Sequence, residues 1–206
     1  MTEPSRVRDR GYARPAMLRV SVLGELQLER DGIQIDPPAR RPARALLGWL
    51  ALHPGMYARS TVAARLWPNV LDESARTSLR TALSALRAVI GIGALLASRE
   101  QIGLADGVWI EAREFDRLRD AGRLDDALAL CRGELLAGFD EDWVLVTRDW
   151  HRERVSETLA VMAADAAGRG SHEESISLAR RRVALDLLDE PAHRDLMRLL
   201  AGAGDR

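Results

Sequence analysis

The 206-residue sequence contains no lysine, so all 30 of its basic residues are arginine. Its single cysteine, Cys131, excludes a disulfide framework and a cysteine-rich metal cluster. No apolar run approaches the ~20 residues that a membrane span requires, and the first residues lack the apolar centre of a secretory signal. We therefore expect a protein of the reducing cytoplasm, with no membrane partner.

Patterns typical of catalysis and cofactor binding are also missing. The four histidines do not have the spacing of paired metal ligands, and a phosphate-binding loop of the Walker type would need a lysine. No GxSxG motif of a serine hydrolase occurs. We expect no catalytic residue, no cofactor and no bound metal, and hence a protein that is not an enzyme.

The charge is divided unevenly between the two halves of the chain. Residues 1–105 contain 15 arginines and 9 acidic residues, a net charge of +6, whereas residues 106–206 contain 15 arginines and 22 acidic residues, a net charge of −7. This asymmetry indicates that the first half meets a polyanion and the second does not. Chance variation of the surface is the alternative interpretation of the charge alone.

Local patterns in the first half predict a small mixed domain over residues 17–110, after a flexible tail at 1–16. Alternating apolar residues on both sides of Asp31-Gly32 predict an antiparallel hairpin. Helical periodicity follows three times, and the third and longest helix covers residues 72–90, with Asp72 as its expected cap. A short hairpin at 95–104 and a strand at 108–110 complete a winged helix-turn-helix with an additional N-terminal sheet.

The second half, residues 111–206, shows helical periodicity and no further strand. Ala167-Gly168-Arg169-Gly170 recurs as Ala201-Gly202-Ala203-Gly204, one tetratricopeptide period of about 34 residues later. We therefore predict a mainly α protein with small β-sheets, in which a winged helix precedes an all-α helical repeat domain of tetratricopeptide type. We expect this repeat domain to be incomplete at its C-terminus.

The third predicted helix contains the stretch SARTSLRTALSALR, which is apolar on one face and basic on the other. From Ser74 to Gly91 it has no acidic residue, so its arginines have no carboxylate partner on the same helix. An α-helix fits the DNA major groove, where arginine pairs with guanine and hydroxyl groups meet bases or phosphates. Together with residues near the second helix and at the hairpin tip, the predicted DNA-binding residues are Arg59, Arg76, Thr77, Arg80, Thr81, Ser84, Arg87 and Arg99.

Several segments together resemble the family of regulators with a bacterial transcriptional activation domain, such as the antibiotic regulatory proteins. In these regulators an OmpR-type winged helix precedes tetratricopeptide-like helices. The matching segments are LRVSVLGELQLERDGIQI, RPARALLGWLALHPG, ARLWPN, ESARTSLRTALSALR, SREQIGLADGVWIEAREF, CRGELLAGFDEDW, LARRRVALD and DEPAHRDLMRLL.

The resemblance implies a sequence-specific DNA-binding transcriptional regulator, usually an activator, that acts as a homodimer on double-stranded DNA. It also places one turn near RNA polymerase, formed by Trp67, Pro68, Asn69, Val70 and Leu71. Two alternatives stay open. The winged helix could be a docking platform of a protein-interaction adaptor, or the chain could be the N-terminal part of a larger multidomain regulator.

Overall fold

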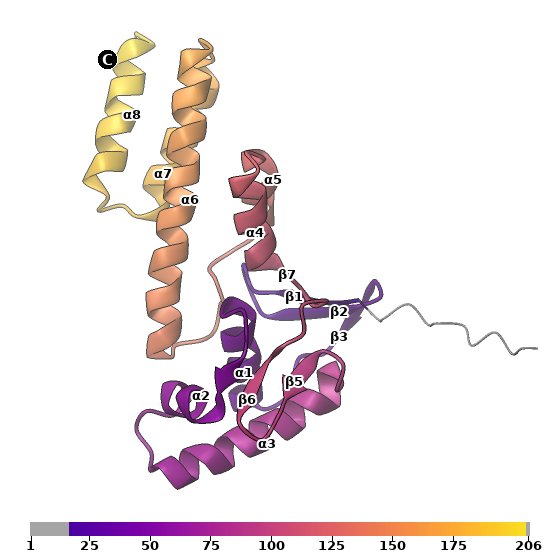
Figure 1. Ribbon diagram of the computed structural model, residues 1–206. Coiled ribbons are helices and arrows are strands. Elements are labelled where there is room, and N and C mark those ends of the chain that lie inside the picture. Colours follow the sequence, from indigo (N-terminus) through magenta and orange to yellow (C-terminus); the bar gives the residue numbers. More distant parts are fainter. Residues whose placement is uncertain (1–16, 205–206) are drawn as a thin grey trace, which may run out of the picture.

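The computed structural model describes residues 17–204, and the predicted tail at 1–16 lies outside the described residues (Figure 1). The fold class is as predicted: small sheets lie in the N-terminal half, and the C-terminal half is helical. The first half comprises β1 (Leu18–Ser21), β2 (Gln27–Arg30), β3 (Ile33–Ile35), α1 (Arg41–Leu52), β4 (Tyr57–Ala58), α2 (Arg59–Leu66), α3 (Asp72–Ile90), β5 (Leu95–Ala97), β6 (Gln101–Leu104) and β7 (Trp109–Ile110). The second half comprises α4 (Glu111–Asp120), α5 (Leu124–Leu130), α6 (Asp142–Gly168), α7 (His172–Leu185) and α8 (Glu190–Gly202).

The first sheet has the strand order β3-β2-β1-β7. Asp31 and Gly32 both have positive φ, at 52° and 85°, so the predicted turn joins β2 to β3. The strand predicted at 108–110 is β7, and it pairs in parallel with β1 instead of extending the nearby hairpin. This long-range pairing brings the end of the winged helix back to its first strand.

The second sheet has the order β4-β6-β5 and forms the wing. The β5–β6 hairpin occurs where the sequence predicts it, but β4 was not predicted because Tyr57 and Ala58 are too short a run to show alternation. Gly103 lies where β6 passes the loop before β4. A Cβ atom there would stand 2.3 Å from the carbonyl oxygen of Gly55, so only glycine fits this close approach.

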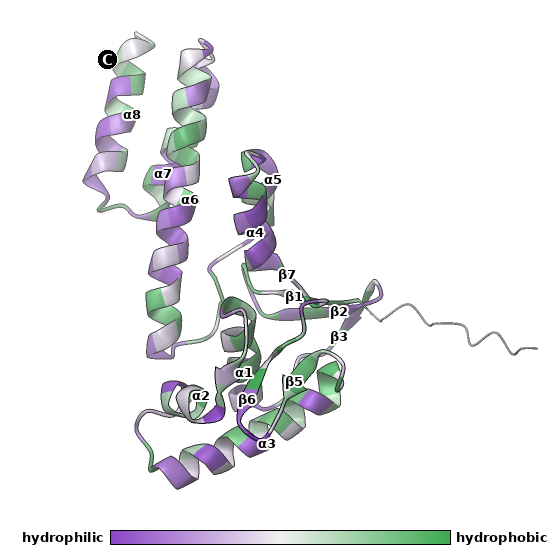
Figure 2. Ribbon diagram, viewed as in Figure 1, coloured by the Kyte–Doolittle hydropathy of each residue, from purple (hydrophilic) through white to green (hydrophobic). Residues whose placement is uncertain are grey.

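The three helices of the first half pack around one apolar core with the wing. Helix α1 is buried along most of its length, and Figure 2 shows α1, β5 and β6 as largely hydrophobic elements beside α3. Helix α3 has the predicted bounds, but the capping prediction is wrong. Leu71 occupies the N-cap position and Asp72 is the first helical residue, so its carboxylate acts only through the helix dipole.

The helical half consists of two hairpins and a final helix. Helices α4 and α5 are joined at Gly122, and α6 and α7 at Gly170, and both glycines have positive φ. Helix α8 then packs on α7. The turn after α8 contains Gly204 with φ 81°, close to the 78° of Gly170, so the two similar sequence segments adopt similar turns. None of the helices formed by residues 17–204 is long and apolar enough to cross a membrane.

The two halves share one hydrophobic core instead of meeting through a flexible linker. The segment between α5 and α6 binds the β1–β2 turn through three backbone hydrogen bonds, one of which runs from Leu136 N to Val22 O at 2.8 Å. Arg148 is buried and holds this segment by donating to the carbonyl oxygens of Leu135, Leu136 and Phe139 at 2.7–2.9 Å. The orientation of the helical half is therefore fixed relative to the winged helix.

Candidate nucleic-acid interface

Helix α3 buries one face and exposes the other, as its 3.6-residue periodicity requires. The buried face consists of Ala75, Leu79, Ala82, Leu83, Leu86 and Ile90. All six residues predicted to contact DNA from this helix are exposed: Arg76, Thr77, Arg80, Thr81, Ser84 and Arg87. The helix therefore presents a continuous row of guanidinium and hydroxyl groups to the surroundings.

Hydrogen bonds within α3 arrange part of this row. Arg80 Nη2 donates to Thr77 Oγ1 at 2.9 Å, and Thr81 Oγ1 donates to the carbonyl oxygen of Thr77 at 3.2 Å. The Thr77 hydroxyl group is neutral, so its hydrogen bond does not balance the positive charge of Arg80. The hydroxyl group of Thr77 instead holds the guanidinium group close to the helix surface.

An open hollow of about 380 Å³ lies between α3 and the tip of the β5–β6 hairpin. It brings together five of the predicted residues from α2, α3 and the wing: Arg59, Arg80, Ser84, Arg87 and Arg99. The other three lie elsewhere on the exposed face of α3: Arg76, Thr77 and Thr81. A concave basic surface beside a convex basic helix has the shape expected for a groove-binding helix with a flanking wing.

Ser98 shapes the wing side of this hollow, and sequence reasoning missed it. Its carbonyl oxygen accepts from Arg59 Nη1 at 3.2 Å, and its hydroxyl oxygen accepts from the backbone N–H groups of Glu100 and Gln101 at 3.2 and 2.9 Å. The signal that could have found it is the serine at the start of a tight turn, where hydroxyl-to-backbone bonds are common. Ser98 thus positions Arg59 toward the same surface as Arg99.

The arginines of the two halves differ in their partners. Among residues 17–105, only Arg19 and Arg41 of the eleven arginines form ion pairs with carboxylates. Among residues 106–204, ten of fourteen arginines form such pairs. The charge asymmetry of the sequence is therefore also an asymmetry of pairing, and the uncompensated positive charge is concentrated in the winged helix.

The α2–α3 turn lies close to the start of α6. Trp67 is half-buried, and the other predicted polymerase contacts, Pro68, Asn69, Val70 and Leu71, are exposed, with Leu71 at 82%. Pro68 and Asn69 border a hollow of about 730 Å³ whose opposite wall is the start of α6. This surface therefore contains residues from both halves of the chain.

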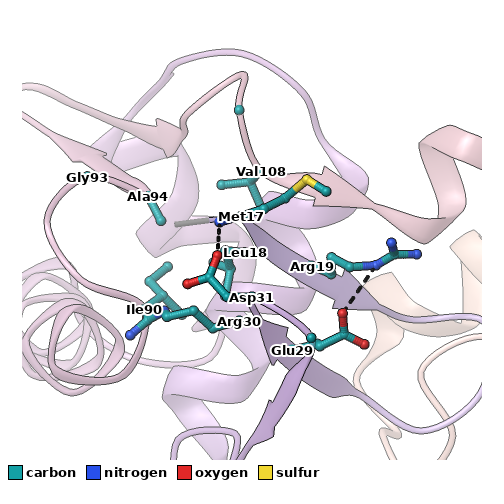
Figure 3. Close-up of a pocket in the computed structure, with 12 residues that line it drawn as sticks. Met17, Leu18, Arg19, Glu29, Arg30, Asp31, Ile90, Gly93, Ala94 and Val108 are labelled. Carbon is teal, nitrogen blue, oxygen red and sulfur yellow. Dashed lines mark hydrogen bonds and ion pairs between the residues drawn. The ribbon is translucent and has the colours of Figure 1, made fainter. Parts of the chain in front are cut away.

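A third hollow, of about 770 Å³, lies at the C-terminal end of α3 (Figure 3). Arg30 Nη2 donates to the carbonyl oxygen of Val89 at 2.9 Å and so stabilises the last turn of α3. Arg19 pairs with Glu29 at 3.8 Å on the other side of the hollow. These side chains already have partners, so we assign this hollow a structural role in fixing the end of α3.

The Cys131 thiol and the His151 ring are adjacent but do not form a reactive pair. Their Sγ and Nε2 atoms are 3.8 Å apart. Burial raises the pKa of the Cys131 thiol to about 12 and lowers the pKa of His151 to about 4. Both groups are therefore neutral near pH 7, which is unsuited to nucleophilic catalysis. No group of residues between 17 and 204 has the arrangement of a metal site.

Comparisons with known proteins match the chain to one family model and to solved structures. Residues 108–206 match the family model of the bacterial transcriptional activator domain. The solved structure of Mycobacterium tuberculosis EmbR in complex with a low affinity phosphopeptide is similar, with a TM-score of 0.71 and 20% sequence identity, over 92% of this chain and 56% of that chain. This chain thus spans little more than half the length of the EmbR chain. No curated protein matches the sequence.

Proposed function

We propose that the chain, whose residues 108–206 match the model of the bacterial transcriptional activator domain, is a transcriptional regulator that binds double-stranded DNA sequence-specifically through α3. The observation that carries the proposal is the exposed face of α3, whose arginines have no carboxylate partner among the described residues. Unbalanced guanidinium groups on a groove-sized helix favour a polyanionic ligand, because phosphate supplies the missing negative charge.

The residues of this surface take two kinds of role. Arg76, Arg80 and Thr77 lie along the outer face of α3, where they would meet base edges in the major groove. Arg59 and Arg99 flank the helix at the hollow beside the wing, where they would meet phosphates and fix the register. We assign this activity to a domain at 17–110 and place it in the cytoplasm, where the DNA is found.

The helical domain at 111–206 is proposed to make protein contacts. We further propose that the regulator is an activator, that it binds DNA as a homodimer, and that its α2–α3 turn contacts RNA polymerase. Val70 and Leu71, at 46% and 82% exposure, support the last point, since apolar side chains exposed on a tight turn favour a protein partner. The nearby start of α6 would extend this contact surface onto the helical half.

Selection of bound duplexes from a random pool, followed by footprinting, tests the proposal and yields the target site. With roughly 4–6 phosphate contacts per subunit, the logarithm of the affinity should fall with the logarithm of the salt concentration with a slope of about −4 to −5 per bound copy. Arg80→Ala should cost about 1–3 kcal/mol at one base position. Arg194→Ala is the matched control, because Arg194 is an exposed arginine on α8.

Two results would contradict the proposal. One is binding that does not depend on salt, and the other is an Arg80→Ala protein that binds the selected site as tightly as the Arg194→Ala control. A different result would favour the adaptor: no DNA binding at low salt, together with a protein partner whose binding depends on Arg76 and Arg80. In that case the winged helix is a docking platform.

A further inference from the structure

Helix α7 has an outward face that its packing against α6 does not use. Its inward face is formed by Ser175, Leu178 and Ala179, which are buried. The outward face borders an open groove of about 830 Å³, which is also lined by the turn that follows α8. The groove is lined by apolar side chains, among them Ile176 and Ala184, and by basic ones.

The basic residues of this groove are exceptions within their half of the chain. Ten of the fourteen arginines between 106 and 204 pair with carboxylates, and Arg113 donates to two backbone carbonyl oxygens. Only Arg180, Arg181 and Arg194 form neither contact, and the first two line the groove. Their neighbour Arg182 turns the other way and pairs with Asp195 at 2.6 Å.

The location of the groove separates it from the DNA surface. Figure 1 shows α7 and α8 beyond α6, at the end of the molecule away from α3. A duplex bound along α3 therefore does not extend over Arg180 and Arg181. The groove is also concave and partly apolar, which suits a single polypeptide segment better than the regular phosphate rows of a duplex.

We propose that this groove binds an acidic peptide segment of a partner protein. Two of its carboxylates pair with Arg180 and Arg181, since guanidinium groups bind carboxylates through two parallel hydrogen bonds. An apolar side chain of the same segment packs against Ile176 and Ala184. Glu173 lies in the first turn of α7 and lines the same groove, so the segment is neutral or basic where it passes this residue.

This proposal rests on the assignment of the helical domain to protein contacts and is independent of DNA binding by α3. Its test is a selection of random peptides displayed against the full chain, followed by affinity measurements with the enriched peptides. The expected sequences contain paired Asp or Glu residues next to one apolar residue. A control peptide, with each Asp or Glu replaced by Asn or Gln, should bind at least about ten-fold more weakly.

Variants of the chain locate the site. The double substitution Arg180→Glu and Arg181→Glu should weaken the selected peptides by about ten-fold or more, whereas Arg194→Glu, outside the groove, should change their affinity less than about two-fold. Circular dichroism checks that both variants stay helical. If the Arg180→Glu, Arg181→Glu protein unfolds, the milder double substitution Arg180→Gln and Arg181→Gln is used in its place.

Several outcomes would overturn the proposal. One is that the enriched peptides contain no acidic residues, and another is that they bind the Arg180→Glu, Arg181→Glu protein and the Arg194→Glu protein equally tightly. A third is that a random duplex displaces the peptides from Arg180 and Arg181. A fourth is that the double charge reversal leaves peptide affinity unchanged and alters only the dimerisation of the chain, measured by sedimentation. If the Arg80→Ala protein loses DNA binding but keeps its peptide affinity, the two binding surfaces are separate and the groove proposal stands. Failure of the DNA proposal is thereby distinguished from failure of this one.

Discussion

Replacing Glu111 tests whether the two halves of the chain are joined as firmly as their contacts indicate. Glu111 is the first residue of α4, and its side chain is only 2% exposed. One carboxylate oxygen accepts from the backbone N–H groups of Val22 and Leu23, both at 2.9 Å, and the other accepts from Arg132 Nη2 at 2.5 Å. A residue of the helical half thus completes the hydrogen bonding of the β1–β2 turn.

The magnitude follows from what each substitution removes. Glu111→Ala leaves two buried N–H groups without acceptors, at about 1–3 kcal/mol each, and opens a cavity, so we expect a loss of about 3–5 kcal/mol in the free energy of unfolding. Glu111→Gln keeps one acceptor oxygen for the N–H groups but loses the charged bond to Arg132, and should cost about 1–2 kcal/mol.

Urea denaturation measures these differences, and hydrogen exchange reports on the two amides directly. Glu114→Gln is the matched control on the same helix, because Glu114 pairs only with the exposed Arg117 three residues away and its loss should change stability little. A loss below about 1 kcal/mol for Glu111→Ala, or unchanged protection of the Val22 and Leu23 amides, would refute this account of the junction.

Three further predictions concern buried or half-buried positions near the same junction. Gly48→Val should lower stability by about 1–3 kcal/mol, measured by urea denaturation, because a Cβ atom there lies 3.1 Å from Leu136 Cδ1. The Cys131 thiol, with its pKa raised from 9.0 to about 12, should react with a thiol reagent roughly ten- to a thousand-fold more slowly in the native protein than in denaturant, and equal rates would contradict this raised pKa. His151, whose pKa is lowered from 6.5 to about 4, is neutral in the native state and binds a proton more readily when unfolded. The free energy of unfolding should therefore fall as the pH drops from 6.5 toward 4, on the order of 1–3 kcal/mol, and His151→Leu should show a shallower fall in the same titration.

Much of the fold could be predicted because it depends on neighbours along the chain. Asp31-Gly32 determines its own turn, and the apolar stripe of α3 determines which face is buried, so both appeared where the sequence placed them. The predicted N-cap of α3, Asp72, was wrong by one position, because the N-cap is Leu71. Which of two adjacent residues is the N-cap depends on the backbone geometry at the helix start. Strand β4 could not be predicted, since it exists only through its pairing with β6.

The candidate site could be predicted only in part. The exposed arginine face of α3 follows from periodicity, but the meeting of Arg59 with Arg99 across the wing hollow requires the folded arrangement of α2 and the β5–β6 hairpin. Ser98 has no distinguishing feature in the sequence beyond a turn. Its contact with Arg59 joins residues that are 39 positions apart in the sequence, so local sequence patterns cannot predict it.

The order of residues is enough to establish which helices are amphipathic, where the turns fall, and that positive charge predominates in the first half. Which of these charges are compensated depends on the folded arrangement. Arg182 pairs with Asp195 whereas Arg180 and Arg181, on the same helix, form no ion pair, and Glu111 is a buried junction residue although it resembles any acidic residue at a helix start. The physical reason is that periodicity and turn geometry act over a few residues, while the energy of a charge depends on its burial and on groups brought close from distant parts of the chain.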